Sequence, residues 1–321
     1  MSMLSRVADN LYWMSRYLER AEHTARIVDV HLNTLLDLAP GMVEKQRLDW
    51  LIKSLKLTDT ADQITDEDDF LKQITFGAES PGSIISAIIT ARENARQVRE
   101  QISSEMWTQL NQLYLSVHGT DADSVWVDRP HEFYVAIKEG SHLFQGITDA
   151  TMNHDQGWHF IQIGRYMERI TNLVTLLEVH LRATDFTQAN GHRDEHYFEL
   201  VALLKSVSAF EAYCKVYNPN VQSVHSAEFL LFNAEFPRSA RFCVEMLQRS
   251  LDALADVTLR QKTMRLNRVA GRLRSALSYD DIDEVIENDY YAYLANIKQQ
   301  TYRIHDTLFD TYITYAIDAA L

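Results

Sequence analysis

The chain carries the stretch LYWMSRYLERAEHTARIVDVHL at residues 11–32 and a related stretch, FIQIGRYMERITNLVTLLEVHL, at residues 160–181. With a shift of 149 residues the two agree at seven positions, which include the whole pattern Arg-Tyr-x-Glu-Arg. Apolar residues recur in both at steps of three and four, the period of a helix with one buried face. The stretch therefore predicts a helix, and its return predicts an internal repeat.

Helical patterns account for most of the chain. Residues 4–38 keep the helical period until an Ala-Pro-Gly sequence at 39–41 stops it, and residues 156–184 keep it after Asp155, a residue type that caps helices. The chain has only 10 Gly and 5 Pro in 321 residues, and no segment alternates strictly between polar and apolar residues. We therefore expect an all-α fold. The apolar stripe of the first helix consists of Leu4, Val7, Leu11, Met14, Leu18, Ala21, Ala25, Val28, Leu32 and Leu35.

Shorter matches extend the repeat along the chain. KSL at 53–55 matches KSV at 205–207 with a shift of 152 residues, and AESPGS at 78–83 matches AEFPRS at 234–239 with a shift of 156. The matches keep their order while the shift grows slowly, as small insertions would cause. We interpret this order as a tandem duplication.

The predicted organisation is a single domain over residues 1–321. Its internal repeats cover about 4–118 and 155–275, a connecting segment covers 119–154, and a C-terminal helical segment covers 276–321. Each half has an apolar face that it cannot bury alone. We therefore expect a duplicated helical bundle whose two similar halves are related by a pseudo-two-fold axis, with the first helices of the halves close together at the centre.

Charge and composition exclude several classes of function. The net charge of −14 argues against sequence-independent nucleic acid binding and against docking on anionic membranes, which both need a surplus of Lys and Arg. The two cysteines, Cys214 and Cys243, cannot define a disulfide framework. The N-terminal sequence lacks the apolar run of a signal peptide, and no apolar run is long enough to cross a bilayer. These features predict a cytoplasmic protein.

A polar stripe accompanies the apolar one on the first predicted helix. Tyr12, Arg16, Glu19, Arg20 and His23 share one face, and apolar residues bound them at both ends, which predicts that the stripe is at least half buried. Glu19 lies one turn after Arg16, so we expect it to neutralise Arg16 and leave Arg20 free. The second copy of the motif supplies Arg165, Glu168 and Arg169.

Two interpretations of these six charged residues remain open. They form a buried network that fixes the register of the two halves, or the surplus of arginine over glutamate binds an anion such as the carboxylate of a peptide. Tyr17 and Tyr166 belong to the same motif and are secondary candidates. His31 and His180 also recur, but they lie three turns further along and are better explained as structural histidines.

A second charged cluster contains Arg92, Glu93 and Arg96, which we also treat as secondary candidates. Ser103 is suited to cap the helix that follows. Metal ligation is not expected, because Thr171 and Asn172 stand in the second repeat where a di-iron site would need Glu and His. The chain also lacks the common phosphate-binding, dinucleotide-binding and serine-hydrolase motifs, so no cofactor and no catalytic residue is predicted.

Three stretches, NLYWMSRYLERAEHTARIVDV, SIISAIITARENARQVREQISSEMWTQLN and FLLFNAEFPRSARFCVEML, resemble the bacterial alpha-E domain family over nearly the whole chain. One departure is Ser15, where that family usually has Gly; the second repeat keeps Gly164. The resemblance implies an all-helical domain with a Glu-Arg motif. It also implies partners, since such proteins are similar to those encoded beside a circularly permuted ATP-grasp ligase and a transglutaminase-like cysteine peptidase.

We therefore expect an accessory or binding component of a system that makes and cleaves peptide amide bonds. It would bind an anionic peptide, or the ligase itself, through the Arg–Glu cluster. One alternative is an enzyme of the same pathway with Glu19 or Glu168 as general base, although flanking arginines lower the pKa of a carboxyl and make it a poor proton acceptor. The other alternative is a purely structural scaffold.

Overall fold

The computed structural model describes residues 3–36, 44–57, 64, 66–120, 122–128, 130–181, 193–256 and 260–314. Every regular element in these residues is a helix, which confirms the all-α prediction. Among the described helices, none combines the length and the apolar character that a membrane span requires.

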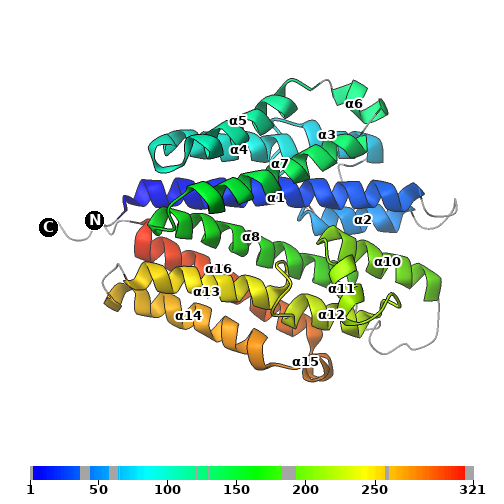
Figure 1. Ribbon diagram of the computed structural model, residues 1–321. Coiled ribbons are helices and arrows are strands. Elements are labelled where there is room, and N and C mark those ends of the chain that lie inside the picture. Colours follow the sequence, from blue (N-terminus) through cyan, green and yellow to red (C-terminus); the bar gives the residue numbers. More distant parts are fainter. Residues whose placement is uncertain are drawn as a thin grey trace.

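The long helices form two four-helix bundles that lie side by side (Figure 1). In each bundle the four helices pack in a closed ring, and the bundles meet where α1 packs on α8. The first bundle consists of α1 (Ser5–Leu36), α4 (Ile84–Gln97), α5 (Ser104–His118) and α7 (Pro130–Thr151). The second consists of α8 (Gln156–His180), α13 (Ala240–Asp256), α14 (Arg260–Tyr279) and α16 (Tyr290–Tyr312).

Shorter helices connect the long ones and pack against them. Two of them cross to the other bundle, because α2 packs on α8 and α10 packs on α1. The shorter elements are α2 (Glu44–Ser54), α3 (Glu67–Phe76), the 3-10 turn η2 (Arg99–Gln101), α6 (Ala122–Asp128), α10 (Arg193–Ser206), α11 (Phe210–Val216), α12 (Ser223–Phe232) and α15 (Ile282–Asn288).

Side-chain caps fix where several helices begin. The Asp155 carboxylate accepts a hydrogen bond from the Gly157 backbone N–H at 3.0 Å and starts α8. Ser103 Oγ accepts from the Met106 N–H at 3.1 Å and starts α5. Both caps are those predicted from the sequence, and each satisfies a backbone donor that the first turn of a helix leaves unpaired.

The first helix is buried almost all round because it lies between the two bundles. Its apolar stripe is buried from Leu11 to Val28, whereas Leu4 at the start of the predicted stripe is 69% exposed. Its polar stripe is buried in part: Glu19 is only 1% exposed, whereas Arg16 and Arg20 are half-buried. Burial of a charged residue is costly unless it is paired, so the position of α1 requires partners from α8.

Candidate functional site

Glu168 of α8 holds two arginines of α1. Its Oε2 accepts from Arg16 Nε at 2.7 Å, and its Oε1 accepts from Arg20 Nε at 2.8 Å. Arg16 also donates to the Tyr12 hydroxyl at 2.9 Å, and that hydroxyl meets His305 Nδ1 of α16 at 2.8 Å. The carboxylate therefore joins the first helices of both bundles.

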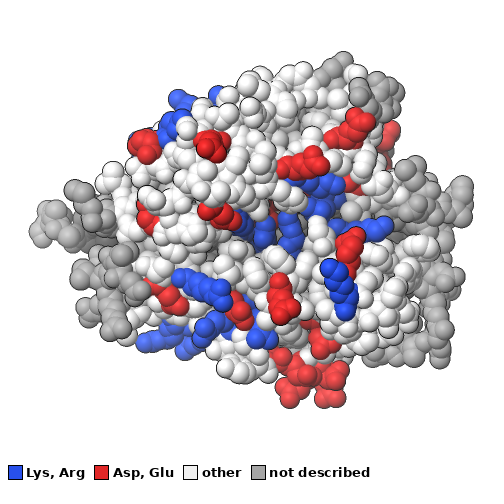
Figure 2. Space-filling view, viewed as in Figure 1, with Lys and Arg blue, Asp and Glu red and all other residues white. Residues whose placement is uncertain are grey.

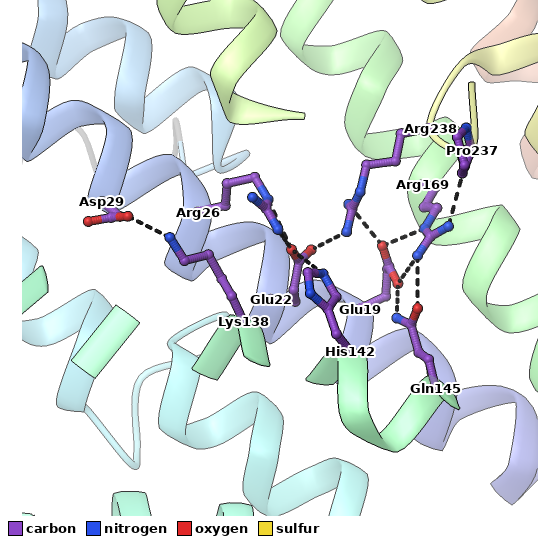
Figure 3. A network of polar contacts seen from close by, with 10 residues as sticks. All are labelled: Glu19, Glu22, Arg26, Asp29, Lys138, His142, Gln145, Arg169, Pro237 and Arg238. Carbon is purple, nitrogen blue, oxygen red and sulfur yellow. Dashed lines mark hydrogen bonds and ion pairs between the residues drawn. The ribbon is translucent and has the colours of Figure 1, made fainter. Parts of the chain in front are cut away.

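Glu19 of α1 forms the reciprocal contact (Figure 3). Its Oε1 accepts from Arg169 Nε of α8 at 2.7 Å and from Arg238 at 3.2 Å. Its Oε2 accepts from Gln145 of α7 at 3.0 Å. Arg238 lies directly before α13, and its second nitrogen is 3.0 Å from Glu22 Oε2. Glu19 is thus fully surrounded by donors from the second bundle and from α7.

These contacts correct one expectation. Glu19 does not neutralise Arg16 on its own helix, and Arg20 is not free, because both arginines pair with Glu168. The side chains on this face of α1 point across to α8, so the nearest opposite charge lies on the other helix. The structure brings the six motif residues together, but Arg165, unlike the other five, forms no ion pair among the described residues.

The network continues along α1 (Figure 3). Arg26 pairs with Glu22 one turn earlier, and His142 of α7 lies 3.5 Å from the same carboxylate. Further along, Asp29 accepts from Lys138 Nζ at 2.6 Å. Figure 2 shows Lys and Arg side chains gathered near the middle of this face, over α1 and α8, with carboxylates around them. Positive charge is therefore concentrated at the junction of the bundles.

Lys56 adds a further cation, since its amine reaches the cluster although the residue as a whole is exposed. It follows α2, has a left-handed backbone conformation with φ 60°, and donates from Nζ to Asn172 Oδ1 of α8 at 2.9 Å. Burial, partly offset by Glu168, lowers the pKa of Lys56 to about 8. At neutral pH the lysine is still mainly protonated, so it adds to the positive charge around Glu168.

Arg165 forms no ion pair with the acidic residues that the structure describes. It is only 6% exposed, and among the described residues none forms a hydrogen bond or an ion pair with its guanidinium. Burial, followed by the nearby charge of Arg169, lowers its pKa below the ordinary value for arginine. A guanidinium stays charged in proteins, so this position holds a buried positive charge that the nearby Glu19 and Asp149 offset only in part.

A small pocket of about 10 Å³ opens inside the cluster, which is room for about one water-sized atom. Its lining includes His23, Asn172, Arg169 and Arg238. His23 Nε2 and Asn172 Nδ2 are buried and make no hydrogen bond in the described structure. Unpaired buried nitrogen atoms are costly, so the pocket presents hydrogen-bonding capacity that the protein itself leaves unused.

Protonation states limit the chemistry of the cluster. Burial opposes the ionisation of Glu168, but the charges of Arg16 and Arg20 outweigh it and lower the pKa of this carboxyl. Burial likewise opposes the ionisation of Glu19, and the charge of Arg169 again prevails, so its pKa is also lowered. Both carboxylates are ionised at neutral pH and are weak bases.

His23 is neutral at physiological pH. Its burial, followed by the nearby charge of Lys56, lowers the pKa of the imidazole to about 3. One ring nitrogen therefore carries a proton and the other accepts. The cluster combines cations, ionised carboxylates and neutral donors, which suits anion binding better than proton transfer.

The two tyrosines of the motif, Tyr17 and Tyr166, were secondary candidates, and an arginine side chain lies over each ring. The Arg20 guanidinium lies over the Tyr17 ring at 5.2 Å, and that of Arg169 lies over the Tyr166 ring at 5.7 Å. Such contacts stabilise a cation by roughly 0.5–1 kcal/mol each and fix the orientation of its planar fork.

Other predicted candidates lie outside the cluster. Arg96 pairs with Glu93 at an exposed position, with 2.6 Å between Nε and Oε1. Arg92 donates to Asn111 Oδ1 at 2.8 Å and lies over the Tyr114 ring at 4.3 Å. Among the described residues, no hydrogen bond or ion pair joins these three charged residues to the motif.

His31 and His180 lie near the C-terminal ends of α1 and α8, where these two helices pack together. They line one pocket together with residues of α2 and α10. His31 Nε2 lies 2.7 Å from Glu67 Oε1, and His180 Nε2 lies 3.4 Å from Ser54 Oγ. Their separation from Glu19 along the helix agrees with the expected three turns.

Several residues of the cluster were not predicted from the sequence. Lys56, Gln145, His142 and Arg238 all contact it. One signal was present, because Arg238 stands where the first repeat has Gly82 in the matched AESPGS and AEFPRS sequences. In the described residues, no group of three His, Cys, Asp or Glu side chains is placed to hold a metal ion.

Comparison with known proteins identifies relatives without a known activity. Uncharacterised proteins of Mycobacterium bovis and Mycobacterium tuberculosis are each 27% identical to the chain over 316 residues, which covers 91% of this chain and 34% of the relative. The chain thus spans about a third of the length of the curated relatives it matches. No solved structure gives a significant match.

A family model matches residues 3–313 and describes a predicted alpha-helical domain with a conserved Glu-Arg motif. The two Glu-Arg pairs at 19–20 and 168–169 fit this description, and they are the residues that join α1 to α8. The chain belongs to the Alpha-E family.

Proposed function

We propose that this domain binds an anionic peptide at the Arg–Glu cluster, with one oxygen of the peptide carboxylate entering the small pocket. One observation carries the proposal: the unpartnered nitrogens of His23 and Asn172 line the same small pocket as Arg169 and Arg238. A carboxylate oxygen in this pocket would accept from the Asn172 amide and from Arg238. His23 adds a third donor when its neutral ring carries the proton on Nε2.

The charge of the cluster supports an anionic ligand. Seven cationic side chains surround three glutamates at the junction of the bundles. The cations are Arg16, Arg20, Arg26, Lys56, Arg165, Arg169 and Arg238, and the carboxylates are Glu19, Glu22 and Glu168. A surplus of buried positive charge is costly because the cations lose their hydration, and a bound anion would offset part of that cost.

The wider context comes from the family resemblance of the sequence. It implies a circularly permuted ATP-grasp ligase and a transglutaminase-like cysteine peptidase as partners. Both chemistries act on peptide carboxyl and amide groups, so a domain that holds a peptide by its carboxylate fits as their accessory component. The ligase is the alternative occupant of the cluster.

A binding role is favoured over an enzymatic one. The lowered pKa values of Glu19 and Glu168 make both carboxylates poor general bases. The buried thiol of Cys243 is also unsuited to nucleophilic attack, because burial raises its pKa to about 12.

Calorimetric titration with acetyl-pentaglycine and with its C-terminal amide tests the proposal. The free acid should bind at least tenfold more tightly than the amide, and Arg238→Gln should remove this difference. Arg241→Gln is the matched control, because Arg241 lies on α13 but pairs at the surface with Glu245. Equal affinity for acid and amide, or no binding of either, would refute carboxylate binding and leave the ion pairs as structural bracing.

We also propose that the two bundles arose by duplication and are related by a pseudo-two-fold axis. Equivalent contacts support this proposal. Lys138 of α7 donates to Asp29 of α1 at 2.6 Å, and Lys298 of α16 donates to Glu178 of α8 at 3.0 Å. The repeats would then include α7 and α16, and so extend beyond the segments over which the sequences match.

Backbone details support the same proposal. Ser83 Oγ donates to the Gly77 carbonyl and caps α4, and Ser239 Oγ donates to the Asn233 carbonyl and accepts from the Phe242 N–H before α13. Lys56 and Ser208, which follow the matched KSL and KSV sequences, are the two described residues other than glycine with positive φ, at 60° and 54°. Both features recur at matching positions, as a duplication would predict.

A further inference from the structure

We call the small pocket lined by His23, Asn172 and Arg238 the carboxylate pocket. A second pocket lies next to it along α1. It has a volume of about 60 Å³, which is room for roughly four waters or one aliphatic side chain. Ile27, Leu51, Ala202 and Phe198 are part of its mainly apolar lining. Phe198 is 41% exposed, so part of this apolar lining is open to solvent.

The two pockets are neighbours along α1 and α10. From α1, His23 lines the carboxylate pocket, and Ile27, one turn later, lines the apolar one. At the end of α10, Val207 lines the former and Ser206 the latter. The same two segments therefore form a wall of both pockets.

We propose that the apolar pocket binds a side chain of the peptide whose terminal carboxylate occupies the neighbouring pocket. This inference rests on the proposed function and specifies its ligand: a peptide with a free C-terminus and one aliphatic side chain upstream. Apolar walls hold water poorly, so an aliphatic group gains free energy by displacing it. His31, His180 and Ser54 also line the pocket, so polar atoms lie beside its apolar walls.

The spacing of the pockets sets the spacing in the peptide. On α1 the carboxylate pocket is lined by Glu19 and His23, and the apolar pocket by Ile27, Val30 and His31. The two centres are thus separated by about eight helical residues, or roughly 12 Å at 1.5 Å per residue. An extended peptide covers ~3.3–3.6 Å per residue, so the aliphatic residue lies three to four positions before the C-terminal one.

The experiment measures the affinities of acetylated pentapeptides of glycine with a free C-terminus and one leucine at each position in turn. Leucine at the first or second position should bind about tenfold more tightly than acetyl-pentaglycine, and leucine at the third or fourth position should add little. The same affinity for every leucine position would overturn the inference while leaving the carboxylate proposal intact. Failure of every free-acid peptide to bind would overturn the proposed function itself.

A filled pocket provides the matched variant. Ala202→Phe should abolish the preference for leucine and leave the affinity for acetyl-pentaglycine unchanged. Ala295→Phe, at an exposed position of α16, is the control and should keep the preference. If Ala202→Phe retains the full preference, the side chain binds elsewhere and the inference is wrong.

Fluorescence of Trp50 gives a readout in the native chain, since its indole lines the apolar pocket. The leucine peptide should shift tryptophan emission in the native protein, and Trp50→Phe should lose this shift. An unchanged shift in Trp50→Phe would place the leucine outside the pocket. This measurement decides the question even if Ala202→Phe does not fold.

Discussion

Gly164 of α8 lies against the backbone of Tyr12 in α1, so closely that a Cβ atom at residue 164 would overlap the Tyr12 carbonyl oxygen. Ser15, whose Cβ would lie 3.3 Å from that added atom, is also small. The two first helices therefore cross at small residues. This close approach brings Glu19 and Glu168 within reach of the arginines on the opposite helix.

Gly164→Ala should destabilise the protein, because the new methyl group meets backbone that cannot move aside. We expect a loss of about 1–3 kcal/mol in the free energy of unfolding, measured by urea denaturation. Gly146→Ala in α7 is the control, since a Cβ there meets nothing within 4 Å. It should stabilise the helix by ~0.5–1 kcal/mol, and equal effects of the two changes would contradict the close crossing.

Glu168→Gln should be strongly destabilising, because it leaves Arg16 and Arg20 without their shared buried counter-charge. The expected loss is about 3–5 kcal/mol. Glu178→Gln removes the partly exposed pair with Lys298 and should cost no more than about 1 kcal/mol. If the two variants lose similar amounts of stability, the buried Glu168 ion pairs contribute no more than the partly exposed pair.

The same comparison predicts a pH dependence. The pKa of Glu168 is lower in the folded protein than the value of about 4.3 in an unfolded chain. Its contribution to stability is therefore complete above that unfolded value and is lost as the pH falls toward the folded pKa. The stability advantage of the native protein over Glu168→Gln should shrink below about pH 4, as equilibrium unfolding would show.

His23 should make the protein sensitive to mild acid. Its pKa is about 3 in the folded state, whereas an unfolded histidine has a pKa of about 6.5. Between these values the unfolded chain binds one more proton, so the free energy of unfolding falls by about 1.4 kcal/mol per pH unit as the pH decreases. His23→Asn should remove this slope between pH 6 and pH 4; identical slopes would show that His23 is protonated in the fold.

Arg165 should reduce stability in the absence of ligand. Arg165→Met keeps a long side chain but removes a buried charge that Glu19 and Asp149 offset only in part, and we expect the free energy of unfolding to rise by about 1–4 kcal/mol. Arg16→Met should have the opposite sign, because Arg16 is paired with Glu168. Destabilisation by both changes would indicate that Arg165 is already compensated.

Local sequence patterns predicted the helices well, because the apolar period and the cap residues lie within each helix or next to it. The apolar stripe from Leu11 to Val28 is buried, and the caps Asp155 and Ser103 start the helices predicted after them. Leu4 was included in the stripe but is exposed, since periodicity does not reveal where the neighbouring helices end. The closure of α7 and α16 onto the bundles depends on distant contacts that no local pattern encodes.

Sequence reasoning identified the motif residues of the candidate site, but not which of them pair with one another. The motif identified Glu19 and Arg16, and spacing on one helix suggested that they pair. The structure joins Glu19 to Arg169 because the stripe faces α8, and only the packing of the helices decides this. Lys56 and Arg238 reach the cluster from short segments next to helix ends, where no periodic pattern marks them.

A crystal structure of the protein with the tightest-binding leucine pentapeptide tests the central claim most directly. The account predicts a carboxylate oxygen within about 3.2 Å of Asn172 Nδ2 and of a guanidinium nitrogen of Arg238. Electron density for the peptide elsewhere, with only a water between His23 and Asn172, would contradict it.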